Sequence, residues 1–229
     1  MAKKLRVDFH THTADDPQDY IAFSSMELID KASSLGFDAL AITNHDIVTF
    51  SPELERYAGE RGILLLPGAE LTLSHKHVIL INPEPDSLPE IRELEDLAEI
   101  KNERNLIIAP HPFYPGFKCL WSKLEEHISV FDAVEFSFFY SRLINRNKRA
   151  VKVAREYRKP LVGCSDCHNI WQVGFTYTLV EAEKNIPSII AAIKGGKAEV
   201  VTAPLSLGMM MRVAVNFGLG DRLKIHLRV

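Results

Sequence analysis

The sequence predicts an α/β fold in which a parallel sheet closes into a barrel. Short apolar runs without polar alternation recur along the chain, a pattern typical of strands that are covered on both faces. Stretches with helical periodicity separate these runs, so strand and helix alternate. Polar side chains of metal-binding types follow several of the runs, as expected for a barrel whose functional groups gather at the carboxyl ends of its strands.

Each expected element has a local signal. The first strand runs out within the segment 7–12, the second covers 39–43, and a helix over 25–35 connects them. Ser24 or Ser25 can cap the start of that helix, and Gly36 follows its last turn. Periodicity predicts further helices over 53–61, 89–104 and 147–157, and further strands over 63–66, 78–81, 106–109, 133–136, 160–163, 176–180 and 199–201. The segment 205–217 is predicted to form a helix that caps the barrel or pairs subunits, so 205–229 is expected to be a helix and tail.

Composition favours one domain and a small substrate. The chain has 229 residues with 46% hydrophobic content, enough for a single core, so 1–229 is expected to be one domain. The formal net charge of -3 disfavours nucleic acid as a partner. No apolar run reaches the ~20 residues that a membrane span requires. Three cysteines and a start without a signal-peptide core predict a cytoplasmic protein with reduced thiols. A homo-oligomer is compatible with these features.

The end of the first strand carries a candidate metal clamp. Side chains two residues apart on a strand point the same way, so His10 and His12 can direct two imidazole nitrogens at one divalent cation. The pair Cys164 and Cys167 could form a redox site, but the neighbours of Cys167, Asp166 and His168, disfavour that role.

The motifs resemble those of the polymerase and histidinol phosphatase (PHP) family of metal-dependent phosphoesterases. They occur in the family's order along nearly the whole chain: Asp8-Phe9-His10-Thr11-His12, Thr43-Asn44-His45, Gly68-Ala69-Glu70, His77-Val78-Ile79-Leu80, Pro110-His111-Pro112 and Ser165-Asp166-Cys167-His168. The segments 174–178 and 186–196, the latter a helix, resemble the family's C-terminal elements. The resemblance implies a distorted (β/α)7 barrel holding two or three divalent ions. The metal ligands that it implies are His10, His12, Asp16, His45, Glu70, His77, His111, Asp166 and His168.

Several assignments leave alternatives open. Asp15, Asp16 and Asp19 compete for one acidic ligand position, and Asp16 has the spacing closest to the family's. His77, at the start of an expected strand, is preferred over His75. Two further positions, Asn44 and Glu135, are not among the implied ligands. Asn44 replaces the family's usual Asp, which removes one negative charge near the metals. Glu135 is equally consistent with a functional role and with a core strand.

The chemistry of phosphate esters explains the number of ligands. Clustered cations neutralise the ester's oxygens and lower the pKa of a bound water toward ~7. Glu70 can bridge two ions, because each carboxylate oxygen can bind a different one. Catalytic roles are expected of Glu70, His45 and Asp166, and Arg142 is the predicted phosphate contact. His and carboxylate ligands without required thiolate favour Mn, Zn or Fe.

The expected activity is therefore hydrolysis of a small phosphomonoester, either a nucleotide or a phosphorylated metabolite, by a metal-activated water. The alternatives are a phosphodiesterase or exonuclease, a metal-dependent amidohydrolase, and a barrel that binds partners without catalysis.

Overall fold

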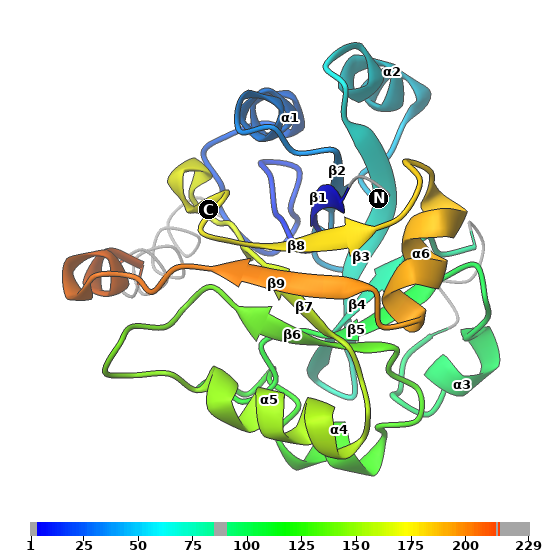
Figure 1. Cartoon of the computed structure of the whole chain (residues 1–229), viewed down its shortest axis with the longest axis vertical. Coiled ribbons are helices and arrows are strands. Elements are labelled where there is room, and N and C mark those ends of the chain that lie inside the picture. Colours follow the sequence, from blue (N-terminus) through cyan, green and yellow to red (C-terminus); the bar gives the residue numbers. More distant parts are fainter. Residues whose placement is uncertain (1–3, 85–90, 214, 216–229) are drawn as a thin grey trace, which may run out of the picture.

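A single mixed sheet of nine strands forms the centre of the molecule. The computed structural model describes residues 4–84, 91–213 and 215 (Figure 1). The strands follow the order β7-β6-β5-β4-β3-β2-β1-β8-β9. Their bounds are β1 Lys4–Asp8, β2 Ala39–Ile42, β3 Leu64–Leu73, β4 Lys76–Ile81, β5 Leu106–Ala109, β6 Ala133–Ser137, β7 Leu161–Cys164, β8 Thr176–Glu181 and β9 Ala198–Thr202. The predicted α/β barrel is confirmed, with nine strands where the distorted (β/α)7 barrel has seven.

Along the sheet, two parallel pairs are followed by two antiparallel pairs, and the pattern then repeats. The pairs β1-β2, β2-β3, β5-β6 and β6-β7 are parallel, as predicted. In contrast, β3-β4, β4-β5, β1-β8 and β8-β9 are antiparallel. The sheet is therefore mixed, whereas the apolar runs had indicated a parallel sheet. Apolar runs report that a strand is buried, but they do not report its direction.

The barrel closes nearly completely where β7 meets β8. The hydroxyl of Thr178 accepts a hydrogen bond from the backbone N–H of Gly163 at 3.0 Å and donates to its carbonyl at 2.9 Å. A Cβ at position 163 would lie 2.7 Å from the carbonyl oxygen of Tyr177. Because only glycine permits this approach, one side chain joins the two strands in place of a backbone ladder.

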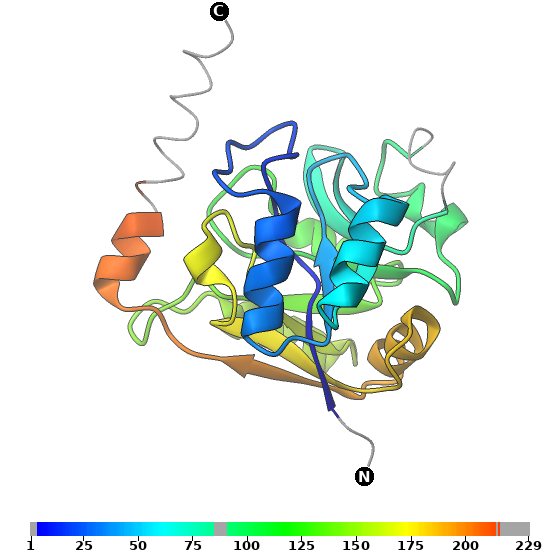
Figure 2. The same ribbon diagram turned by 90° about the horizontal axis from the view of Figure 1, so that it is seen from above.

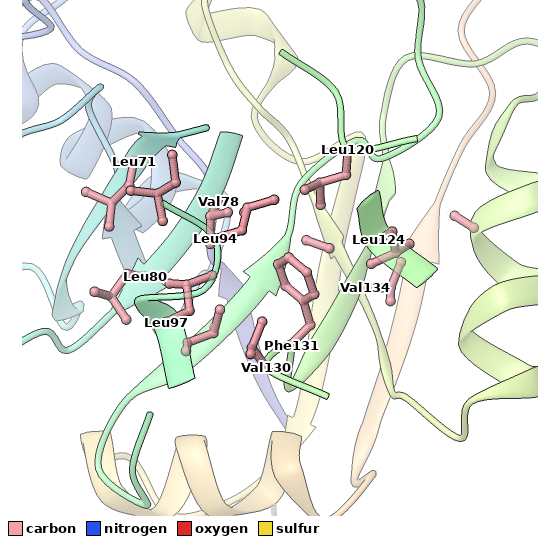
Figure 3. Packing of buried hydrophobic residues seen from close by; sticks show 14 of the residues in the cluster. Leu71, Val78, Leu80, Leu94, Leu97, Leu120, Leu124, Val130, Phe131 and Val134 are labelled. Carbon is pink, nitrogen blue, oxygen red and sulfur yellow. The ribbon is translucent and has the colours of Figure 1, made fainter. Parts of the chain in front are cut away.

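The helices cover the sheet and bury most of its apolar residues (Figure 2). Their bounds are α1 Ser25–Ser34, α2 Pro52–Glu60, α3 Leu97–Ile100, α4 Ser122–Glu126, α5 Asn147–Glu156 and α6 Ile186–Lys194, with a 3-10 turn over Ile170–Gln172. One core cluster joins β3 to β6 with α3, α4 and α5 (Figure 3). A second packs the strands against α6, and a third packs α1 and α2 on β2 and β3.

Most helices lie within two residues of their predicted bounds, but the predicted helix 89–104 is wrong. Among the described residues of that segment, only Leu97–Ile100 is α-helical. The Asp96 carboxylate accepts hydrogen bonds from the backbone N–H groups of Arg92 and Glu93, each at 2.8 Å. An Asp side chain that binds preceding N–H groups stabilises a turn in place of a continuous helix.

The predicted C-terminal helix is present over 207–213. Leu205 and Val213 are buried against Phe138, so this segment covers part of the barrel. Residues 214 and 216–229 of the predicted helix and tail lie outside the described residues. Within the described part of the chain, no helix combines the length and apolar character of a membrane span.

Candidate metal centre

Five parts of the chain bring histidines and carboxylates to one end of the barrel. His10 and His12 follow β1, His45 follows β2, and His111 follows β5. Glu70 and His77 lie within β3 and β4, which form an antiparallel hairpin. Asp166 and His168 follow β7. All nine predicted ligands take part in groups of three whose donor atoms lie within 4.8 Å of one another: His10, His12, Asp16, His45, Glu70, His77, His111, Asp166 and His168.

Glu70 occupies the middle of this cluster. Its Oε1 lies 2.8 Å from Nδ1 of His77 and 3.1 Å from Nε2 of His111. Its Oε2 lies 3.3 Å from Nε2 of both His10 and His12, and 3.2 Å from Nε2 of His45. The two oxygens therefore face different sets of imidazoles, which is the arrangement that a carboxylate bridging two cations requires.

The spacing of the donor atoms fits bound cations. Nε2 of His10 and Nε2 of His12 are 3.0 Å apart, and they lie 3.4 and 3.5 Å from Oδ1 of Asp166. Ligands at ~2.1 Å from one ion are separated by about 3.0 to 3.4 Å in tetrahedral or octahedral geometry. Two neutral imidazole nitrogens this close would repel each other unless a proton or a cation lay between them. The residues present therefore fit a polynuclear metal site.

The acidic residues after His12 have different surroundings. Oδ1 of Asp16 accepts hydrogen bonds from the backbone N–H groups of Gln18 and Asp19, each at 2.8 Å. Oδ2 of Asp16 lies 2.9 Å from Nδ1 of His12 and 2.8 Å from Nδ1 of His45. Asp16 thus orients two histidines, and its carboxylate can bind the same cation as these histidines.

The two competing acidic residues, Asp15 and Asp19, contact different parts of the structure. The Asp19 carboxylate lies 3.1 Å from Nε2 of His168 and 3.7 Å from Nδ1 of His45. Asp15 is exposed and accepts a hydrogen bond from the hydroxyl of Ser25 at 2.7 Å, away from the cluster. Asp16 and Asp19 therefore both stay candidates for the acidic ligand.

Backbone conformation helps to direct the donors inward. His111 and Asp166 have φ values of 27° and 43°, a region that few residues other than glycine adopt. Each lies two residues after the last residue of its strand, so the left-handed residue redirects the chain beside the cluster. Such conformations persist where surrounding contacts hold them, and they concentrate at functional sites.

The charges of the cluster depend strongly on one another. Burial opposes the charged form of His10, but Asp166, Glu70 and Glu135 outweigh it and raise its pKa to about 10. The pKa of His77 is lowered to about 4, chiefly by burial. The pKa of Glu70 lies well below its usual range because nearby histidines outweigh the effect of burial. The carboxylates thus stay ionised and attract positive charge, whether protons or metal ions.

Two buried carboxylates outside the predicted ligand set position these groups. Oε2 of Glu135, in β6, lies 2.9 Å from Nδ1 of His10, and both side chains are fully buried. Oδ1 of Asp8 accepts hydrogen bonds from the backbone N–H groups of His10, at 3.3 Å, and Ser165, at 3.1 Å. Asp8 therefore ties the ends of β1 and β7 together. A charged residue in the middle of an apolar strand, as Glu135 is, was the sequence signal for this role.

Other candidates lie apart from the donors or have structural contacts. His75 is exposed in the turn before β4, whereas His77 is buried against Glu70. The Asn44 amide donates to Thr13 and Thr49, at 3.0 and 2.7 Å, so it binds neighbouring loops with a donor that Asp lacks. Arg142 is exposed, and the pocket it lines with residues 141, 143 and 204–207 contains none of the proposed metal ligands.

The two cysteines near Asp166 do not have the surroundings of a redox pair. Cys164 and Cys167 are free, buried and packed in different core clusters. Burial raises the pKa of the Cys164 thiol well above its usual range and that of Cys167 to about 12. Reactive cysteines have lowered pKa values, so a packing role fits both.

Comparison with known proteins identifies the fold. Residues 145–198 match the family described as PHP-associated. An uncharacterized protein of Methanocaldococcus jannaschii is 27% identical over 126 residues, which cover 55% of this chain and 72% of that protein. The segment 145–198 contains the Ser165 to His168 motif and leads into β9, so the match covers the end of the barrel.

Solved structures extend the likeness to nearly the whole chain. A two-domain protein of Bacteroides vulgatus, described as containing a predicted PHP-like metal-dependent phosphoesterase, is similar with a TM-score of 0.68 and 20% identity, covering 96% of this chain and 70% of that chain. The lesion-specific endonuclease PfuEndoQ of Pyrococcus furiosus is similar with a TM-score of 0.62 and 16% identity, covering 92% of this chain and 66% of that chain. These likenesses confirm the PHP-like fold that the motifs predicted.

Proposed function

We propose that this chain, which belongs to the PHP family of metal-dependent phosphoesterases, hydrolyses a small phosphomonoester at a site holding two or three divalent ions. The observation that carries the proposal is the position of Glu70, whose two oxygens face different sets of histidines. That arrangement supports a bridged metal pair, with His10, His12 and His45 beside one oxygen and His77 and His111 beside the other.

The chain's own residues supply the binding and orientation that the reaction needs. Bound divalent cations would neutralise the phosphoryl oxygens and lower the pKa of a bound water. Glu135 fixes the ring of His10, and Asp16 fixes the rings of His12 and His45. The side chains of these two carboxylates and three histidines are almost completely buried, so they hold their positions without rearrangement in the reaction.

We further infer a substrate class, the identity of the metals and a location. A net charge of -3 supports a small substrate over a long polyanion. The abundance of imidazole donors supports Mn, Zn or Fe. Arg142 is the proposed contact to the phosphate. The free thiols of the three cysteines are compatible with a cytoplasmic location.

Metal content and hydrolysis of p-nitrophenyl phosphate, measured together on the purified chain, test the proposal. We expect two or three ions per chain and turnover of the monoester that Mn restores after chelation. The bis(p-nitrophenyl) diester serves as the comparison, because one structurally similar protein is described as a lesion-specific endonuclease. Turnover of the diester alone would assign the chain to the nuclease-like alternative, and bound metal without either activity would leave a binding protein.

A further inference from the structure

A polar cavity lies at the opposite end of the barrel from the candidate metal centre. Its volume is about 500 Å³, and its lining includes Lys101, Asp132, Lys159 and Lys194. The first three precede β5, β6 and β7, and Lys194 ends α6. Because β5, β6 and β7 are parallel, their amino ends share one end of the barrel. The strands, at ~3.3 Å per residue, separate this cavity from the metal donors by about 13 Å or more.

The cavity has an excess of positive charge. Four cationic side chains line it, at Lys101, Arg158, Lys159 and Lys194, against the carboxylates of Asp132 and Glu103. Glu103 is exposed, whereas the side chain of Asp132 is only 7% exposed, so Asp132 is the better shielded of the two carboxylates among these lining residues.

The oxygens of Asp132 are already engaged. Oδ1 lies 2.9 Å from Nζ of Lys101, and Oδ2 accepts a hydrogen bond from the backbone N–H of Ile107 at 2.9 Å. Nζ of Lys194 is 3.7 Å from Oδ2. A single carboxylate therefore has to compensate several ammonium groups.

Among the three lysines that line the cavity, Lys159 has the most unused hydrogen-bonding capacity. Its Nζ donates to the carbonyl of Phe131 at 2.6 Å. An ammonium group has three N–H donors, so within the described part of the chain two of them remain for a ligand. Burial lowers the pKa of Lys159, and Lys101 lowers it further, with only Asp132 acting against them. Lys194 donates to the carbonyl of Asn102 at 2.5 Å and also has donor capacity left.

We propose that this cavity binds a phosphate oxyanion. A dianion placed between Lys159 and Lys194 would accept their remaining hydrogen bonds and neutralise the charge that Asp132 leaves uncompensated. The cavity lining contains no histidine, so the site is assigned to binding and not to hydrolysis. Because its residues come from the loops before β5, β6 and β7 and from α6, a bound anion would link these elements and stabilise the fold. The ligand is either free phosphate or the phosphoryl group of a metabolite.

Thermal unfolding of the metal-loaded full chain tests this site, with phosphate added at constant ionic strength and chloride as the reference anion. We expect phosphate to raise Tm. Lys159→Gln and Lys194→Gln should each weaken the apparent affinity for phosphate about tenfold, the effect of one lost charge-assisted hydrogen bond. Lys152→Gln, an exposed position on α5, is the matched control and should leave the affinity unchanged.

The metal centre is a second potential phosphate site, so the experiment is repeated on the Glu70→Gln variant. The increase in Tm that depends on Lys159 and Lys194 should persist in Glu70→Gln. The phosphate site can therefore be confirmed or rejected even if the proposed enzymatic function fails. Methylphosphonate, which a phosphoesterase cannot hydrolyse, distinguishes the source: equal binding indicates a metabolite's phosphoryl group, and binding of phosphate alone indicates the free ion. The proposal is overturned if phosphate does not raise Tm, or if the folded Lys159 and Lys194 variants respond to phosphate as Lys152→Gln does.

Discussion

Glu135, in β6, holds the ring of His10, which follows β1, with 2.9 Å between Oε2 and Nδ1, although four strands separate β6 from β1 in the sheet. This contact turns Nε2 of His10 toward His12 and Glu70. The second oxygen of Glu135 is buried and has no hydrogen-bond partner among the described residues. A carboxylate that orients a histidine in this way raises the basicity of the ring and fixes its tautomer, so β6 influences metal binding without supplying a proposed ligand.

Replacing Glu135 with Gln should reduce metal affinity by about 10 to 100-fold, the usual effect of removing a carboxylate partner from a metal-binding histidine. The side chain keeps its shape, so the fold should persist. Competition with a metal-binding dye measures the affinity, and Glu125→Gln, which removes only an exposed pairing with Arg149, is the control. Equal affinities in the two variants would contradict the orienting role.

Glu70→Gln should lower the number of bound ions by at least one and abolish p-nitrophenyl phosphate hydrolysis, because an amide cannot offer two anionic oxygens to two cations. Mass spectrometry of the metal content and circular dichroism of the same sample separate ion loss from unfolding. A variant with full activity and full metal content would disprove the bridging role.

Metal binding should release protons at pH 7. The pKa of His10 is raised to about 10 in the metal-free chain, so His10 holds a proton below that pH and must lose it to bind a cation. Affinity should therefore rise with pH over the range below about 10 and fall as pH decreases. Calorimetric titration with Mn in buffers of different ionisation enthalpy measures the protons released. An observed heat independent of the buffer would be inconsistent with this linkage.

Gly163→Ala should destabilise the barrel by about 1 to 3 kcal/mol, since the added Cβ would overlap the carbonyl of Tyr177. Gly59→Ala is the matched control. In α2 its Cβ meets nothing within 4 Å, and the change should stabilise the helix by about 0.5 to 1 kcal/mol. Urea unfolding compares the two free energies of unfolding. If both substitutions stabilised the protein, the close approach of β7 and β8 would not be needed.

Arg142→Gln should raise KM for p-nitrophenyl phosphate about tenfold and leave metal content unchanged, as expected for the loss of one charge-assisted contact to the substrate. Arg155→Gln, at an exposed position on α5, is the control. Steady-state kinetics of both variants measure KM for p-nitrophenyl phosphate. An unaltered KM for Arg142→Gln would show that other groups bind the phosphate.

Much of the fold could be predicted from local signals. Helix α1 begins where Ser24 and Glu27 form a capping box, which the sequence indicates directly. The donors His10, His12 and His77 lie in the predicted cluster because strand periodicity and strand ends determine where they point.

What could not be predicted depends on contacts distant in sequence. Glu70 lies within β3 and not after it, because β3 continues through Gly68 to pair with β4. The turn at Asp96 replaced a helix through hydrogen bonds that periodicity does not report. The choice between Asp16 and Asp19 depends on where a loop places His45 and His168, which spacing alone does not determine.

The backbone N–H of Asp166 donates to the carbonyl of His10 at 2.9 Å, and Thr11 pairs with Cys167 in an isolated parallel bridge. Donors from the beginning of the chain and from its final third therefore meet in one cluster. During synthesis, a chain that has not reached Asp166 holds an incomplete donor set and has not closed the loop that joins His10 to Asp166. Full metal affinity should therefore require a chain synthesised at least through His168, with β8, α6 and β9 still to follow.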